Sequence, residues 1–155
     1  MCLAPNKKPS SRLPATPPSR PPATPQEGVI LCYSTLLATP AAAASWFYGA
    51  TGLAGLIVLQ MLLSVNYWRK PEWGPRRNAD CGTAVLISVL VANHWSAACQ
   101  WCTAVRLMYF ACFCIWCNAI RLWFSSPTWV WWHATFHLLM GTTGTVMAIG
   151  LAGRL

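Results

Sequence analysis

Hydrophobic residues in this chain are gathered into long runs instead of alternating with polar residues. No Lys, Arg, Asp or Glu occurs at 28–68, 81–105 or 122–153. About 20 apolar residues suffice for a helix to cross a bilayer, and each of these runs is at least that long. The pattern therefore predicts transmembrane helices.

We place the spans at about 42–65, 81–98, 101–123 and 129–151. Residues 29–39 are too few to cross alone, and Pro40 is expected to end any helix that precedes it, so we interpret 29–39 as an interfacial lead-in. The predicted fold is all-α: an integral membrane bundle of about four transmembrane helices, occupying 29–155.

Tryptophan placement supports these spans. Aromatic rings settle at the headgroup level of a bilayer and form belts there. The chain has 10 tryptophans, and those near the predicted span ends are Trp46, Trp68, Trp73, Trp95, Trp101, Trp123, Trp129, Trp131 and Trp132.

Residues 1–28 have a different composition, rich in Pro, Ser and Thr. A short repeat, SRLPATP followed by SRPPATP, lies within them. A proline-rich segment with little apolar surface predicts a disordered tail that leans toward polyproline II. The absence of acid before Glu27 also fits an organelle transit peptide, although a plain tail is the simpler interpretation. Which membrane holds the protein is left open.

Charge is scarce and strongly basic. Only 9% of residues are charged, against about 25% in a soluble domain, and the 11 Lys and Arg outnumber the 3 Asp and Glu. Basic residues near span ends tend to stay cytoplasmic. The loop 66–80 carries Arg69, Lys70, Arg76 and Arg77, and Arg121 lies in the third loop, so we expect both loops to face the cytosol and both termini to face away. The aromatic residues flank apolar runs instead of alternating with basic ones, which argues against nucleic-acid binding.

Small residues recur at helical spacing in two of the spans. Such residues let transmembrane helices approach closely. Packing within the chain is the more ordinary interpretation, and a homo- or hetero-oligomer within the lipid bilayer is the alternative. The residues concerned are Gly144, Ala148 and Ala152, the pair Ala50 and Ala54, and the pair Thr51 and Gly55.

Two histidines, His133 and His137, lie four residues apart near the start of the last span. On a helix both rings share one face, and polar residues inside a membrane usually face the bundle interior. Asp80 opens the second span from the same predicted side, so these three side chains are candidate zinc ligands with room for a water. Ser64 and Asn66, at the end of the first span, would support them as a second layer of hydrogen bonds. The alternatives are that Asp80 caps its helix and that His133 is an interfacial ring.

The cysteines suggest a different metal site. Cys99 and Cys102, followed by Cys114 and Cys117, have the spacing of a zinc ribbon. A ribbon needs polar turns between its cysteine pairs, and the segment between these pairs is apolar. We therefore interpret Cys112, Cys114 and Cys117 as small apolar residues of a buried helix.

The stretch WWHATFHLLMG resembles the last-helix H-x-x-x-H segment of the alkaline ceramidase/adiponectin-receptor-like membrane hydrolases. That resemblance implies zinc binding by His133 and His137 with an aspartate, here Asp80. Those proteins have seven helices and a further histidine that this chain does not match. The loop NYWRKPEWGPRRNAD is similar to one in small eukaryotic multi-pass membrane proteins without an assigned activity.

These observations favour a non-catalytic binding, assembly or scaffold subunit of a membrane. The alternative is a zinc-dependent membrane hydrolase acting on a lipid amide or ester, with Arg69, Lys70, Arg76 and Arg77 holding anionic headgroups.

Overall fold

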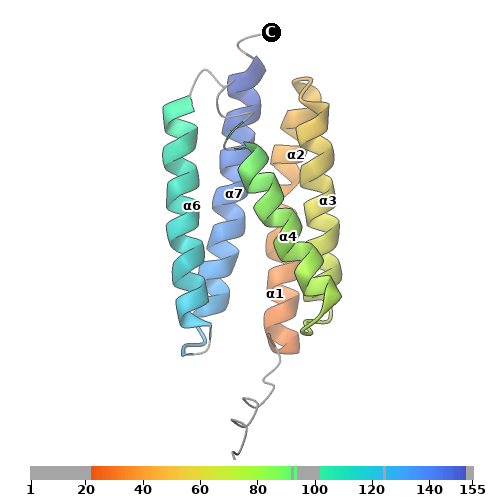
Figure 1. The fold of residues 1–155 in the computed structure, drawn as a ribbon, viewed down its shortest axis with the longest axis vertical. Coiled ribbons are helices and arrows are strands. Elements are labelled where there is room, and N and C mark those ends of the chain that lie inside the picture. Colours follow the sequence, from red (N-terminus) through yellow and green to blue (C-terminus); the bar gives the residue numbers. More distant parts are fainter. Residues whose placement is uncertain (1–21, 92, 94–101, 124, 153–155) are drawn as a thin grey trace, which may run out of the picture.

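A computed structural model describes residues 22–91, 93, 102–123 and 125–152 of the chain. Helices packed side by side form this part, and it contains no strand (Figure 1). The all-α prediction is confirmed. In chain order the elements are α1 (Pro25–Thr35), the 3-10 turn η1 (Leu36–Ala38), α2 (Thr39–Phe47), α3 (Thr51–Trp68), α4 (Pro75–Leu90), α6 (Cys102–Leu122) and α7 (Trp129–Ala152).

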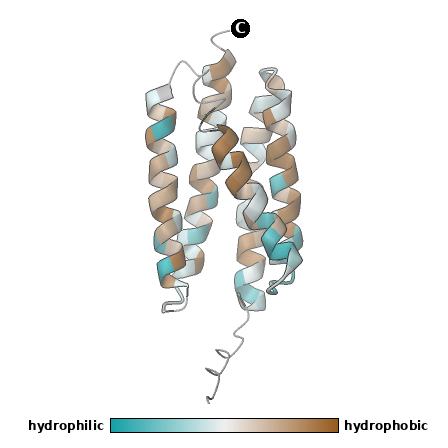
Figure 2. Cartoon of the chain, viewed as in Figure 1, coloured by the Kyte–Doolittle hydropathy of each residue, from teal (hydrophilic) through white to brown (hydrophobic). Residues whose placement is uncertain are grey.

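Four helical segments of the described chain are long and apolar enough to cross a membrane: Pro25–Phe47, Thr51–Trp68, Thr103–Leu122 and Trp129–Ala152. Figure 2 shows hydrophobic residues along their length, and hydrophilic residues gathered mainly at the lower end of the bundle. Large apolar side chains cover the outer faces, and Phe110 is 66% exposed. Such a surface requires lipid around it. The chain is an integral membrane protein.

The first span begins earlier than the sequence predicted. We expected 29–39 to lie at the interface, but α1 begins at Pro25 and continues through η1 into α2. Pro40 does not stop the chain, because it stands in the first turn of a new helical segment, where its missing N–H has no helical partner to lose. The predicted tail boundary at residue 28 is therefore too late, and residues 1–21 of that tail lie outside the described residues.

The predicted span at 42–65 is also wrong, because a turn interrupts it. α2 ends at Phe47, and Gly49 follows with a φ of 79°. Glycine adopts that conformation without the steric cost that a Cβ brings. Trp46 is exposed beside the turn, so this ring lies at a membrane surface between two spans instead of opening a single one.

The structure covers only part of the predicted span at 81–98. α4 begins at Pro75, and its regular α-helical part ends at Leu90. Residues 92 and 94–101 lie outside the described residues, so the end of this span is not tested. The described part of α4 has 16 residues, and it is not among the segments that are both long and apolar enough to cross. Helices are present where the third and fourth spans were predicted.

The division of the predicted first span into two helical segments, Pro25–Phe47 and Thr51–Trp68, changes the expected topology. Figure 1 shows the start of α1, the α3–α4 connection and the α6–α7 connection together at the lower end. Two hydrogen bonds join the start of α1 to the α6–α7 connection: Trp129 Nε1 donates to Glu27 Oε1 at 3.0 Å, and Trp123 Nε1 donates to the Pro22 carbonyl. We call this the basic end. The C-terminal end of α7 lies at the other end, so the prediction that both termini share one side is wrong.

Most of the positive charge belongs to the basic end. The tail precedes α1 in the chain, so its lysines and arginines are expected on the side of the membrane where α1 begins. Nine of the 11 basic residues then share one side: Lys7, Lys8, Arg12, Arg20, Arg69, Lys70, Arg76, Arg77 and Arg121. The positive-inside rule predicts that this side faces the cytosol.

α7 is the centre of the packing and contacts α1, η1, α2 and α6. Gly141 lies so close to the Leu37 carbonyl that a Cβ would collide with it, and a Cβ at Gly144 would lie 2.9 Å from Ala41 Cβ. The small residues of α7 therefore serve contacts within the chain. By contrast, Gly55 is exposed and a Cβ there would meet nothing within 4 Å.

α6 packs on α7 through a single seam. Val105, Cys112 and Ala119 are buried at every seventh position, which is the repeat that keeps one helical face on its partner. Cys114 and Cys117 are exposed on the outer surface, so the expectation that these two cysteines are buried is wrong. Cys99 lies outside the described residues.

We predict that the basic end faces the cytosol. An N-glycosylation acceptor inserted in the turn at 48–50 should be modified in microsomes, whereas one inserted after Lys70 should not. Modification of both insertions would contradict the bundle, because the two sites lie at opposite ends of α3.

We predict that Gly141→Ala destabilises the protein by about 1–3 kcal/mol, the usual cost of overpacking, because its Cβ would meet the Leu37 backbone. Thermal unfolding in detergent measures the effect. Gly55→Ala is the control, since the space beside Gly55 is open. Equal midpoints for the two variants would contradict the close approach.

Candidate functional site

Asp80 is buried in the bundle near the basic end, with 7% of its surface exposed. Its Oδ1 accepts hydrogen bonds from Gln60 Nε2 at 2.7 Å and from the Ser64 hydroxyl. Gln60 Nε2 also lies 3.0 Å from Ser64 Oγ and 3.3 Å from the Asp80 carbonyl. We call these three residues the Asp80 cluster, and they join α3 to α4.

Helical spacing builds the Asp80 cluster. Gln60 and Ser64 are four positions apart and therefore share one face of α3. Asp80 lies beyond the first turn of α4, which begins at Pro75 without a side-chain cap. The alternative that Asp80 caps its helix is therefore wrong, and the carboxylate instead has its hydrogen bonds from the neighbouring helix.

His137 is engaged with the first helix of the chain. Its Nδ1 lies 2.8 Å from Ser34 Oγ, and the Ser34 hydroxyl is also 3.0 Å from the Leu31 carbonyl. Whichever atom carries the proton, Nδ1 is occupied, and Nε2 is the ring nitrogen left for another partner. This contact holds α7 against α1.

His133 lies within an aromatic cluster at the basic end. Its ring packs edge-on against Trp68 at 5.2 Å and against His137 at 4.8 Å between ring centroids. Trp129 lies between Trp68 and Trp123, with the two tryptophan pairs 6.3 and 5.3 Å apart. The two histidines share one face of α7, and His133 has aromatic neighbours in keeping with an interfacial ring.

The structure does not gather the three predicted zinc ligands into a metal site. No group of three or more His, Cys, Asp or Glu among the described residues is placed to hold a metal ion. Asp80 is bonded to α3, whereas His137 is bonded to α1. Zinc binding by His133, His137 and Asp80 therefore stays a prediction from the sequence. The third histidine of the chain, His94, lies outside the described residues.

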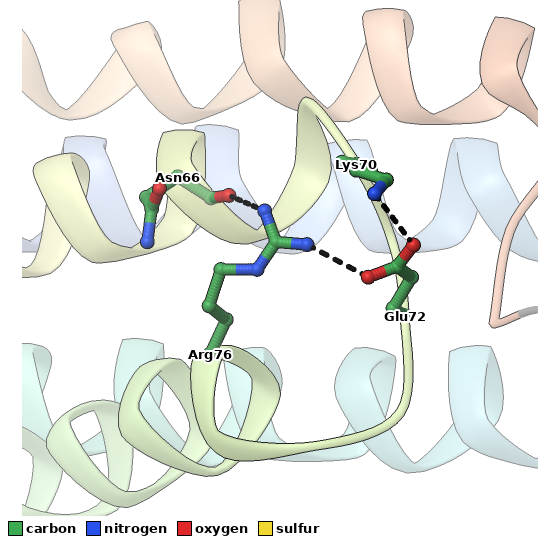
Figure 3. A network of polar contacts seen from close by, with 4 residues as sticks. All are labelled: Asn66, Lys70, Glu72 and Arg76. Carbon is green, nitrogen blue, oxygen red and sulfur yellow. Dashed lines mark hydrogen bonds and ion pairs between the residues drawn. The ribbon is translucent and has the colours of Figure 1, made fainter.

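Asn66, in the last turn of α3, contacts Arg76 of α4 through its backbone carbonyl. Figure 3 shows Arg76 between two partners: its Nη1 donates to the Asn66 carbonyl at 3.4 Å, and its Nη2 pairs with Glu72 at 3.0 Å. Lys70 Nζ lies 3.1 Å from the same carboxylate. The hydrogen bond from Lys70 lowers the pKa of Glu72 below its usual value. Two of the four basic residues predicted to hold lipid headgroups thus already have an acidic partner.

Arg77 is held differently, by the faces of aromatic rings. Its guanidinium lies 4.7 Å from the centre of Trp73 and 5.9 Å from that of Trp123. Cation–π contacts of this kind fix the position of an arginine while leaving its charge uncancelled. The aromatic cluster therefore extends to the loop after α3 and keeps a positive charge at the membrane surface.

A cavity of about 110 Å³ lies inside the bundle. Toward the basic end its wall includes Gln60, Ser64 and His137, whereas Leu53 and Met147 lie at its far end. No Lys, Arg, Asp or Glu is found among the described residues of its wall. Mostly apolar pockets with a few convergent polar groups are the usual binding sites for small ligands.

Two functional candidates, Gln60 and Ser34, were missed by the sequence analysis. Gln60 lies in an uninterrupted apolar run, four residues before Ser64. That spacing, which puts both side chains on one helix face, was the available signal. Ser34 lies in the segment taken for a lead-in outside the membrane, so its contact with His137 was not expected.

Comparisons with known proteins give no match to any family model, curated protein or solved structure. The candidate site therefore rests on its own geometry.

We predict that Asp80→Leu lowers the free energy of unfolding by about 1–3 kcal/mol, because Gln60 and Ser64 would keep buried donors without an acceptor. Asp80→Asn should lose less, since its amide oxygen still accepts. Unfolding in detergent measures both variants, with Asn78→Leu at an exposed position of the same helix as control. A loss as large for Asn78→Leu would count against the cluster.

The zinc content of the purified protein tests the zinc hypothesis. If His133, His137 and Asp80 hold zinc, the purified protein contains bound zinc and the His137→Ala variant loses it. Metal analysis of both proteins decides the matter. Equal zinc content in the two proteins would leave the histidines as packing residues.

Proposed function

We propose that this chain is a non-catalytic multi-pass membrane protein that binds a small ligand from the bilayer in the cavity inside its bundle. The cavity is the observation that carries the proposal, because its wall is formed by several helices and is apolar apart from a few polar groups. Ligands dissolved in lipid reach such a site without crossing water.

The engagement of the polar side chains supports binding in preference to hydrolysis. Asp80 accepts two hydrogen bonds from α3 side chains, and His137 Nδ1 is bonded to Ser34 on α1. These groups connect helices, whereas the hydrolase alternative needs Asp80 beside both histidines. An assembly role through the exposed helix faces is compatible with ligand binding and stays a prediction.

We predict that a photoactivatable hydrocarbon carrying a small click tag labels the protein saturably in lipid nanodiscs. Labelled peptides should include residues of the cavity wall such as Met61 and Met140. Ala84→Phe should reduce this labelling at least several-fold, because Ala84 lines the cavity and a phenyl ring there would fill it. Mass spectrometry of labelled peptides provides the measurement.

The matched control is Val85→Phe, one position along α4, where the side chain is 58% exposed toward lipid. It adds a similar ring to the same helix outside the cavity, so its labelling should equal that of the unmodified protein. Equal labelling of Ala84→Phe and Val85→Phe, or labelling confined to exposed residues, would overturn the proposal.

A further inference from the structure

The shape of the cavity limits the size of its ligand. Its wall extends from Leu53 to Ser64 on α3 and from Phe136 to Met147 on α7. At 1.5 Å per residue each stretch covers about 16 Å along the bundle. A volume of about 110 Å³ spread over that length is narrow, because one water-sized sphere already needs about 10–15 Å³ of it. The space fits one extended chain and is too thin for a lipid with two.

Three polar residues of the wall, Gln60, Ser64 and His137, lie toward one end. α3 runs toward the basic end and α7 runs away from it (Figure 1), so Gln60, Ser64 and His137 lie nearer that end than Leu53 and Met147 do. The far end adjoins a cluster of buried apolar side chains that includes Leu53, Ile87, Val91, Val105 and Met147, with Tyr109 packed against it. The wall toward the basic end thus offers an amide, a hydroxyl and an imidazole, whereas the far part is mostly apolar, with Ser88 and Tyr109 as its polar residues. This arrangement favours an amphiphile with its head toward the basic end.

The wall also selects the chemistry of the head. Gln60 Oε1 is buried and has no hydrogen-bond partner among the described residues, so it is available to accept a hydrogen bond from a ligand. His137 keeps Nε2 free while Nδ1 contacts Ser34. The Ser34 hydroxyl donates to the Leu31 carbonyl, so Nδ1 donates to Ser34 and Nε2 is an acceptor, like Gln60 Oε1. A hydroxyl head supplies the hydrogen-bond donor that these acceptors lack.

The lack of basic residues in the cavity wall argues against a ligand with an acidic head group. The described wall contains no Lys or Arg to pair with a carboxylate or phosphate, and the Asp80 carboxylate lies directly behind Gln60 and Ser64. Burying an unpaired anion there would carry a large desolvation penalty. Asp80 does not itself line the cavity, and its Oδ1 is already bonded to Gln60 and Ser64, so an ammonium head would gain no direct partner.

We propose that the cavity takes a neutral single-chain lipid with a hydroxyl head, of the long-chain alcohol or monoacylglycerol class. The head lies between Gln60 and His137, and the chain extends toward Met147. This inference rests on the proposed function and adds the class and orientation of the ligand.

The test compares photoactivatable, click-tagged probes of equal chain length that end in a methyl, a hydroxyl or a carboxylate. In nanodiscs the alcohol should label cavity peptides at about tenfold lower concentration than the hydrocarbon, as expected for one or two net hydrogen bonds. Unlabelled monoacylglycerol should compete if that is the source of the head, and a free long-chain alcohol should compete if it is not.

Two variants examine the head site. Gln60→Leu and His137→Phe should remove the preference for alcohol over hydrocarbon while hydrocarbon labelling persists, which shows that the cavity is still formed. Should either variant unfold, hydrocarbon labelling is lost as well, and the comparison of probes on the unmodified protein still decides.

The outcomes separate the two proposals. If the hydrocarbon labels saturably and Ala84→Phe abolishes it, but the alcohol has no advantage or the carboxylate binds best, the inference is overturned and the proposed function stands. If no probe labels cavity peptides saturably, the proposed function itself is overturned.

Discussion

A polar side chain inside a bilayer has no water to bond, so it must find its partner on a neighbouring helix. That constraint determines which helices of this chain lie together. The Asp80 carboxylate accepts from Gln60 and Ser64, which places α4 against α3. His137 contacts Ser34, which places α7 against α1. Hydrophobic contacts alone cannot specify these neighbours, because lipid offers an apolar side chain an equally apolar surface.

Close approach of the backbones at glycine also holds α7 against the first span. Along α7 the successive contacts with the first span are His137 with Ser34, Gly141 with Leu37 and Gly144 with Ala41. The spacing of three or four residues on both sides keeps two parallel helices in register. A side chain at Gly141 would push the two backbones apart and draw the His137 ring away from its hydroxyl partner.

The sequence predicted the general architecture well and the first helix poorly. Uncharged runs identified a membrane bundle, and Trp123 and Trp129 correctly marked the end of the third span and the start of the fourth. The first run was misread because Pro40 was taken as a stop and Gly49 was not taken as a turn. The capping box of Thr24 and Glu27, with both hydrogen bonds formed, was the local signal that a helix begins at Pro25.

The candidate site was predictable in its residue types but not in its contacts. Spacing alone placed His133 and His137 on one face, and it put Ser64 near Asp80. It could not show that Ser34 would reach His137, because that pair depends on how the first and last spans pack over more than a hundred residues of sequence. Gln60 was hidden for a simpler reason: one amide barely changes the hydropathy of a long apolar run.

The pairing of the first span with the last has a consequence for biosynthesis. α1 enters the membrane before α3, α4 and α6 are made, yet its lasting neighbour α7 emerges only after all of them. Until then the Ser34 hydroxyl and the surface that will face Gly141 are open to lipid or to the insertion machinery. The bundle therefore closes only once α7 has emerged and not span by span, and a ribosome that stalls before Trp129 leaves behind an intermediate with its central helix missing.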